Sequence, residues 1–272
     1  MTVVVRRPGP PLGGLVRAIT YQAGEQPRTS VEKILPGPAA SLWINLNRDE
    51  FRSFDEFGRV TRVPGAMLAG PTSRAAVIEF EQGRAHISVT FALGAASCFF
   101  APPLNVTRDL QIPLGDVWGR PGTVLRERVL GAATPDALDV VEGVLLGALC
   151  GLRDPLVRDP LVVAACGALS AGVPVGKVAA ELWVLPRTLR RRFTAHVGLG
   201  PKRFAQVQRL QRVVRDLDGC ASVDWAGVAA RHGYTDQPHL VEEFRQLVGV
   251  TPTGYLRSRI DGPNHLRIDE FS

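Results

Sequence analysis

Outward-facing arginines mark the start of a helix expected near the carboxyl end of the sequence. This helix is expected to begin at Pro186, and Leu189 and Phe193 lie four residues apart on its inward side. The side chains that then project outward could contact DNA bases: Arg187, Thr188, Arg190 and Arg191. Because a guanidinium can pair with both O6 and N7 of guanine, the spacing predicts a helix that reads base edges. The alternative is that these arginines form a solvated surface.

A second segment, about fifty residues further along, repeats the pattern with other side chains. Leu240 and Phe244 are again four apart, Gly233 suits a tight turn, and Thr235 is expected to cap the helix. The candidate base-reading residues here are polar and expected to be exposed: Asp236, Gln237, His239 and Glu242. Glutamine can pair with adenine, and a carboxylate can accept from cytosine N4. We expect Glu243 to be exposed as well, which predicts weaker binding by this second unit.

Positive charge is concentrated between Lys177 and Arg215. This segment has ten basic residues and one acidic residue, Glu181, so it carries +9, whereas the whole chain carries +6 and the remainder therefore −3. Such a concentration favours a phosphate-binding surface. The residues expected to contact phosphates lie near the ends of expected helices: Lys202, Arg203, Thr235 and Arg245.

Each of the two segments reads as a helix, a tight turn and a second helix, which is the pattern of a helix-turn-helix unit. Between them, residues 201–217 predict one long helix with its apolar residues on one side. A helix of that length spans roughly 25 Å at 1.5 Å per residue. Two units held at that distance could enter successive major grooves on one face of a duplex.

Four short segments resemble the AraC/XylS-type transcription regulators: Leu189–Phe193, Gly233–Leu240, Phe244–Arg245 and Gly249–Leu256. The resemblance covers about residues 160–258. It implies a seven-helix domain in which a long helix joins two helix-turn-helix units that bind double-stranded DNA.

Three residues depart from the family pattern. Trp183 stands where a small residue is usual, and Leu185 stands where a serine or threonine usually caps the helix, a loss worth about 1 kcal/mol. One interpretation is that Trp183 packs against the neighbouring domain. Glu242 stands where relatives often carry a polar or basic base-reading residue, which leaves the sequence preference of that half-site open.

The first 115 residues read as strands and turns, because prolines are frequent and apolar residues alternate, as over 41–46. Residues 76–80 and 85–91 predict a hairpin with Gly83 in its turn. Looser similarities to the β-rich sensor-type domain of one branch of the family lie at Ile34–Gly37, Leu42–Leu46, Phe91–Phe100 and Val117–Gly119. We therefore predict an α+β protein: a β-rich regulatory domain over 1–133, a helix and linker over 134–159, the double helix-turn-helix domain over 160–258 and a tail over 259–272.

Aromatic residues of the β-rich domain are candidates for a pocket that binds a small-molecule effector: Trp43, His86, Phe91, Phe99 and Phe100. The alternative is that the aromatic side chains form the core. A helix over 134–150, with Thr134 as its expected cap, has an apolar stripe that could dimerise or pack within the chain: Leu138, Val141, Leu145 and Leu149.

Other functions find less support in the residues. His86 is the only histidine before residue 196 and no Cys-x-x-Cys occurs, so we expect no metal site, no cofactor and no enzymatic activity. The alternatives are a basic protein-interaction module and a DNA-repair-associated protein sharing the helical domain, although Cys98 has no clustered cysteines for the zinc site of such a protein. We expect no membrane span and a cytoplasmic, nucleoid-associated location. The expected partners are double-stranded DNA, RNA polymerase, a small-molecule effector and a second copy of the chain.

Overall fold

The computed structural model describes residues 2–24, 30–55, 57–80, 85–100, 103–151, 158–220, 223–260 and 264–267. Over this part of the chain, two antiparallel sheets are followed by helices, which confirms the predicted α+β class. One sheet has the order β1 (Thr2–Arg6), β2 (Val16–Ala23), β9 (Ala85–Phe91), β4 (Ser41–Asn45), β7 (Ala66–Ala69) and β10 (Gln111–Pro113). The other has the order β11 (His265–Arg267), β3 (Ser30–Ile34), β8 (Ala76–Phe80), β5 (Glu50–Phe54) and β6 (Val60–Pro64).

The predicted hairpin between residues 76–80 and 85–91 is wrong. Both strands form with the expected bounds, but β8 pairs with β3 and β5, whereas β9 pairs with β2 and β4 in the other sheet. The turn around Gly83 lies outside the described residues. Alternation defines the faces of each strand but not its partner, so the pattern alone did not distinguish a hairpin from a crossing between sheets.

Helices cover one face of the first sheet: α1 (Leu114–Trp118), α2 (Arg120–Leu130) and α3 (Thr134–Cys150). The first two were not predicted, whereas the third has the expected bounds, with Ala133 rather than Thr134 at its N-cap position. The stripe that could dimerise or pack within the chain is buried within it: Leu138, Val141 and Leu145 lie in the same core as Leu42 and Ile44 of β4, with Leu149 partly buried beside them. This burial favours the intramolecular alternative for that stripe.

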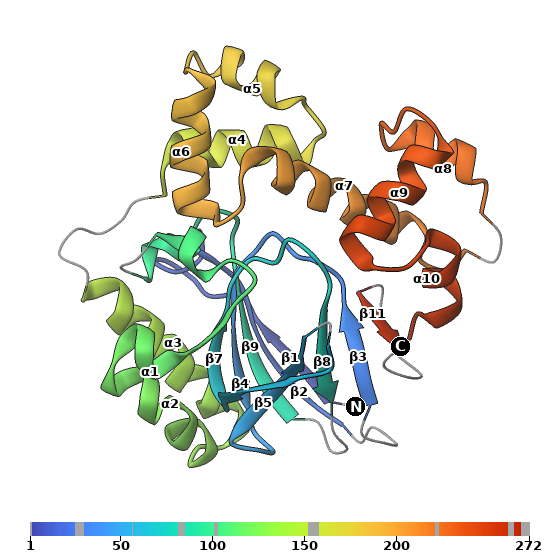
Figure 1. Ribbon diagram of the computed structural model, residues 1–272. Coiled ribbons are helices and arrows are strands. Elements are labelled where there is room, and N and C mark those ends of the chain that lie inside the picture. Colours follow the sequence, from blue (N-terminus) through green and yellow to red (C-terminus); the bar gives the residue numbers. More distant parts are fainter. Residues whose placement is uncertain are drawn as a thin grey trace.

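The carboxyl-terminal half is helical and forms a second core. Its helices are α4 (Pro160–Ser170), α5 (Val175–Glu181), α6 (Pro186–Val197), α7 (Pro201–Asp216), α8 (Trp225–Arg231), α9 (Gln237–Val248) and α10 (Pro252–Ser258). The long helix predicted over 201–217 is α7, and it connects the pair α5–α6 with the pair α8–α9 (Figure 1). Leu189, Phe193, Phe204, Leu240 and Phe244 lie in this core, as their spacing predicted.

The two halves share more than a linker. Residues 265–267, expected to be part of a tail, instead form β11, which pairs with β3 and extends the second sheet. Leu266 of β11 and Leu35 after β3 are both buried in the core of the helical half. No helix in the described ranges is long and apolar enough to cross a membrane.

Candidate nucleic-acid interface and inter-sheet cavity

The turns of the two helix-turn-helix units have the same backbone and different residues. Trp183 and Gly233 each donate from N to the residue three before them, Ala180 and Ala230, at 3.0 and 3.3 Å. Both have a positive φ, +54° for Trp183 and +72° for Gly233, a region that favours glycine. Trp183 is 94% exposed, so the interpretation that it packs against the neighbouring domain is wrong.

The first recognition helix, α6, presents its arginines to solvent. Arg187, Arg190 and Arg191 are exposed and Thr188 is half-buried, as expected from the inward side of the helix. No side chain caps α6, because Leu185 stands at the N-cap position. Arg192 points elsewhere: its Nε and a terminal nitrogen donate to the carboxylate of Asp159, at 2.8 and 2.7 Å.

The second recognition helix, α9, has a different cap from the one predicted. Asp236, not Thr235, is the N-cap residue, and its Oδ1 accepts from the backbone N of His239 at 2.8 Å. This bond occupies one carboxylate oxygen of a candidate base-reading residue. Gln237, His239 and Glu242 are exposed, so they are accessible to a duplex.

Glu243 is buried, which corrects the expectation that two adjacent glutamates face the phosphates. Its Oε2 accepts from Arg209 of α7 at 2.6 Å and from Gln206 at 3.1 Å. Arg209 also lies over the ring of Tyr234, with its guanidinium carbon 4.2 Å from the ring centre, and burial raises the pKa of Tyr234. Arg209 of the basic segment therefore neutralises Glu243 inside the protein. Of the two adjacent glutamates expected to weaken DNA binding by the second unit, only Glu242 is exposed.

The candidate phosphate contacts differ in accessibility. Lys202 at the start of α7, Thr235 before α9 and Arg245 in the last turn of α9 are exposed. Arg203 is half-buried, and burial lowers its pKa. Its side chain donates to Gln206 at 3.4 Å, so it is less available than Lys202.

The carboxyl-terminal ends of both recognition helices contact the sheet domain. At α6, Nδ1 of His196 lies 3.0 Å from the Ser97 hydroxyl, and a Cβ on Gly198 would lie 2.4 Å from the ring of Pro71. At α9, the carbonyl of Leu247 accepts from the backbone N of Ala75 at 2.8 Å. The amino-terminal halves, where base readers are expected, point away from that contact.

A cavity of about 230 Å³ lies between the two sheets of the amino-terminal half. We call it the inter-sheet cavity; its main side chains are Ile34, Trp43, Phe51, Arg52, Met67, Ile78, Glu79, His86 and Gln111. Trp43 and His86 were expected at a pocket, and their rings are 5.0 Å apart. The expectation for Phe91, Phe99 and Phe100 is wrong: they are buried in the core on the helix-covered face of the sheet.

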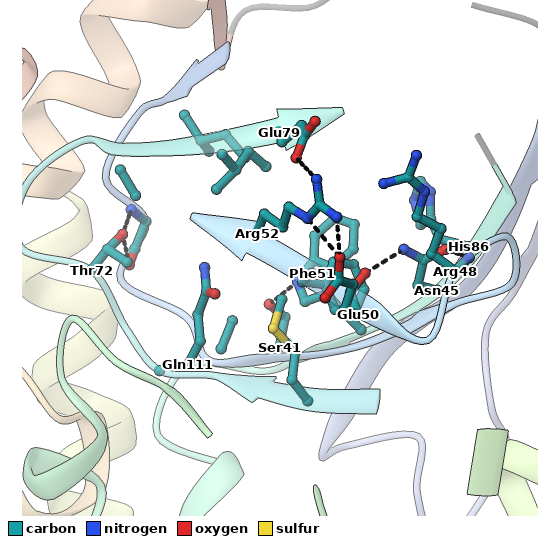
Figure 2. Close-up of a pocket in the computed structure, with 18 of the residues that line it drawn as sticks. Ser41, Asn45, Arg48, Glu50, Phe51, Arg52, Thr72, Glu79, His86 and Gln111 are labelled. Atoms are coloured by element: carbon teal, nitrogen blue, oxygen red, sulfur yellow. Dashed lines mark hydrogen bonds and ion pairs between the residues drawn. The ribbon is translucent and has the colours of Figure 1, made fainter. Parts of the chain in front are cut away.

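An ion-pair cluster at this cavity was missed by the sequence reasoning. Nε of Arg52 donates to Glu50 at 2.6 Å and a terminal nitrogen donates to Glu79 at 3.3 Å (Figure 2). The hydrogen bond to Glu50 raises the pKa of Arg52. Glu50 and Arg52 lie two residues apart in β5, so both side chains are on one face of the strand. In the sequence, such a charged face is equally typical of a solvated edge strand, so it did not indicate a cavity. Within the described ranges, no group of three His, Cys, Asp or Glu could hold a metal ion.

Two family models match the chain. A helix-turn-helix domain matches residues 178–258, and a domain of unknown function (DUF6597) matches residues 5–113. No curated protein matches. The first match confirms the prediction of a helix-turn-helix domain in the carboxyl-terminal half.

Several solved structures are similar at low sequence identity. ToxT from Vibrio cholerae is 10% identical over 88% of this chain and 98% of its own, with a TM-score of 0.48. The DNA-binding domain of AdpA, solved with a target DNA, is 29% identical over 36% of this chain and 89% of its own, with a TM-score of 0.32. The AraC-like activator CuxR is 14% identical over 77% of this chain and 86% of its own, with a TM-score of 0.28.

Proposed function

We propose that this chain, a DNA-binding transcription regulator of the AraC/XylS type, inserts α6 and α9 into successive major grooves of one duplex. The observation that carries this proposal is the placement of the recognition helices. Both are anchored at their carboxyl-terminal ends on the sheet domain and have exposed polar residues at their amino-terminal ends. Both units lie on the same side of the sheet domain (Figure 1).

Base recognition is assigned mainly to α6. Arg187, Arg190 and Arg191 are exposed there, and each bidentate contact with guanine contributes about 1–3 kcal/mol of discrimination. In α9 we assign the role to Gln237, His239 and Glu242. Lys202, Thr235 and Arg245 position the protein on phosphates, a term that does not depend on sequence.

The inter-sheet cavity is proposed as the site of a small-molecule effector. Its wall is bonded to the DNA-binding half at two places: Gln211 of α7 donates to the carbonyl of Pro36 at 2.8 Å, and Ala75 donates to Leu247 of α9. Pro36 follows the cavity residue Leu35, and Ala75 precedes the cavity residue Ala76. Because these segments contact both sites, a ligand that moves them changes the placement of α7 and α9.

Substitution of Arg190 tests the assignment of base recognition. A preferred duplex is first selected from a random library with the full chain, and binding is then measured by fluorescence anisotropy at several salt concentrations. Arg190→Ala is expected to lose preference at one base pair, by about 1–3 kcal/mol, and to keep its affinity for unrelated duplex. Arg120→Ala removes the same charge from an exposed position of α2 and should change neither quantity.

An unchanged preferred sequence for Arg190→Ala would contradict the role of that residue. Failure of the full chain to bind any duplex at low salt would instead favour the alternative of a basic protein-interaction module. We propose four further properties that follow from the regulator role. They are contact with RNA polymerase, a cytoplasmic location at the nucleoid, pairing with a second copy of the chain, and action by binding rather than by catalysis.

A further inference from the structure

The inter-sheet cavity has the size of a single substituted ring. An engineered apolar cavity of about 150 Å³ accepts benzene, so 230 Å³ holds a six-membered ring with a few further atoms. Its apolar wall comes from both sheets: Trp43 and Met67 from one, and Phe51, Ile34 and Ile78 from the other. Flat apolar rings pack well against such aromatic and thioether side chains.

The charged side chains that line the cavity balance, because Arg48 and Arg52 oppose Glu50 and Glu79. Arg52 is held between Glu50 and Glu79, with its shortest contact to Glu50 at 2.5 Å. A carboxylate ligand that approached this guanidinium would also approach both glutamates, so like charges oppose its entry. The cluster therefore disfavours an anion, and with Arg48 the lining has no net charge that would select a cation, which favours a neutral ligand.

Most polar groups of the wall are already hydrogen-bonded within the protein. Ser41 accepts from the Trp43 indole at 2.8 Å, Asn45 donates to the carbonyl of Glu50 at 3.0 Å, and the Thr72 hydroxyl accepts from the backbone N of Gly37 at 2.8 Å. Gln111 differs from them. Its Oε1 is buried and, among the described residues, has no hydrogen-bond partner.

The amide of Gln111 reaches into the cavity from β10, on a wall other than the one that carries Arg52 (Figure 2). An unpaired buried amide is unfavourable, and a ligand that satisfies it binds more tightly for that reason. A hydroxyl group suits the amide in either orientation, because it can both donate and accept.

We infer that the inter-sheet cavity binds a small neutral ring that carries a hydroxyl, a ligand of the phenol class, with its hydroxyl on Gln111 and its ring against Trp43. This inference rests on the proposed role of the cavity as the effector site and adds the chemical class of the effector. Arg52 does not pair with the ligand; together with Arg48 it balances the charges of Glu50 and Glu79.

Three ring probes of similar size test the inference by calorimetric titration of the full chain. Phenol, toluene and benzoate differ in one group, which is a hydroxyl, a methyl or a carboxylate. We expect phenol to bind most tightly and benzoate least. Gln111→Met keeps the length of the side chain and removes its amide, so it should weaken phenol about tenfold and leave toluene unchanged.

Toluene binding by Gln111→Met shows that the variant retains the cavity, and Gln246→Met makes the same change at an exposed position of α9 as a control. The inference is overturned if none of the probes binds, if benzoate binds as tightly as phenol, or if Gln111→Met binds phenol with unchanged affinity. DNA affinity is measured separately. Phenol binding without any change in DNA affinity would support the ligand class and contradict the effector role, whereas DNA binding without phenol binding would overturn the ligand class alone.

Discussion

At the scale of single residues, the two helix-turn-helix turns form a natural comparison. The second has Gly233 at its positive-φ position, and the first has Trp183 at the equivalent position. A side chain with a Cβ in this region costs about 1–2 kcal/mol. Trp183 offsets none of this by burial, because almost all of its side chain is in solvent.

Trp183→Gly is therefore expected to stabilise the protein by about 0.5–1 kcal/mol, after allowing for the greater backbone freedom of glycine in the unfolded chain. Gly233→Ala should do the reverse, by about 1 kcal/mol, since no atom lies within 4 Å of the added Cβ and only the backbone is affected. Urea unfolding of both variants measures the pair. Equal stability of Trp183→Gly and the parent chain would show that the first turn is not strained.

At the scale of elements, α4 and α6 are joined by one buried carboxylate. Asp159 caps α4 by accepting from the backbone N of Leu161 at 3.0 Å, and it accepts from Arg192 of α6. Burial raises the pKa of Asp159, but the hydrogen bonds and charge of Arg192 outweigh it, so the net pKa is lowered. Arg192 thus ties α6 to the start of α4, while Arg187, Arg190 and Arg191 stay exposed, as the proposed base contacts require.

A group whose pKa is lowered by folding stabilises the protein above its ordinary pKa and loses that contribution as the pH falls through the folded value. Asp159→Asn should therefore lower stability at pH 7 by about 1 kcal/mol, a value reduced because Arg192 is partly exposed. The difference should shrink as the pH falls below about 4, where the carboxylate of the unfolded chain takes up a proton, and disappear below the lowered pKa of the folded state. Unfolding curves at pH 7, 5 and 3 test this, with Glu127→Gln on the exposed side of α2 as the control; a difference that is independent of pH would exclude the ionic cause.

At the scale of the whole molecule, β11 places residues 265–267 in the sheet that forms one wall of the cavity. His265 lies 2.8 Å from the buried carboxylate of Glu32 on β3, and the backbone N of Leu35 donates to the carbonyl of Asn264 at 3.0 Å. Leu266, which follows His265, is buried in the core of the helical half. This strand therefore couples the two halves independently of the linker.

Leu266→Ala is expected to destabilise the protein by about 2–4 kcal/mol, because it leaves a void where both halves meet. Arg267→Ala changes the next residue of the same strand, which is exposed, and should stay within about 0.5 kcal/mol of the parent. Differential scanning calorimetry measures both. Similar transitions for Leu266→Ala and Arg267→Ala would mean that β11 contributes little to the joining of the halves.

The local spacing of apolar residues in the sequence determined the bounds and the buried faces of many helices and strands. Spacings of three and four placed Leu189, Phe193, Leu240 and Phe244 in the core, and the α6 arginines outside it, because a helix fixes the side to which each residue points. Alternation likewise defined the bounds of β8 and β9. Such patterns depend only on neighbours along the chain.

Only the tertiary structure decided which distant residues meet. Four features depend on residues that no periodicity in the sequence relates. They are the placement of β8 and β9 in different sheets, the pairing of β11 with β3, the burial of Glu243 against Arg209 and the position of Gln111 opposite Arg52. Each of these features depends on which surfaces pack together, and the competing surfaces have similar polarity in the sequence. The sequence alone therefore predicted a DNA-binding fold of the helix-turn-helix type, and tertiary packing determined the shape and chemistry of the inter-sheet cavity.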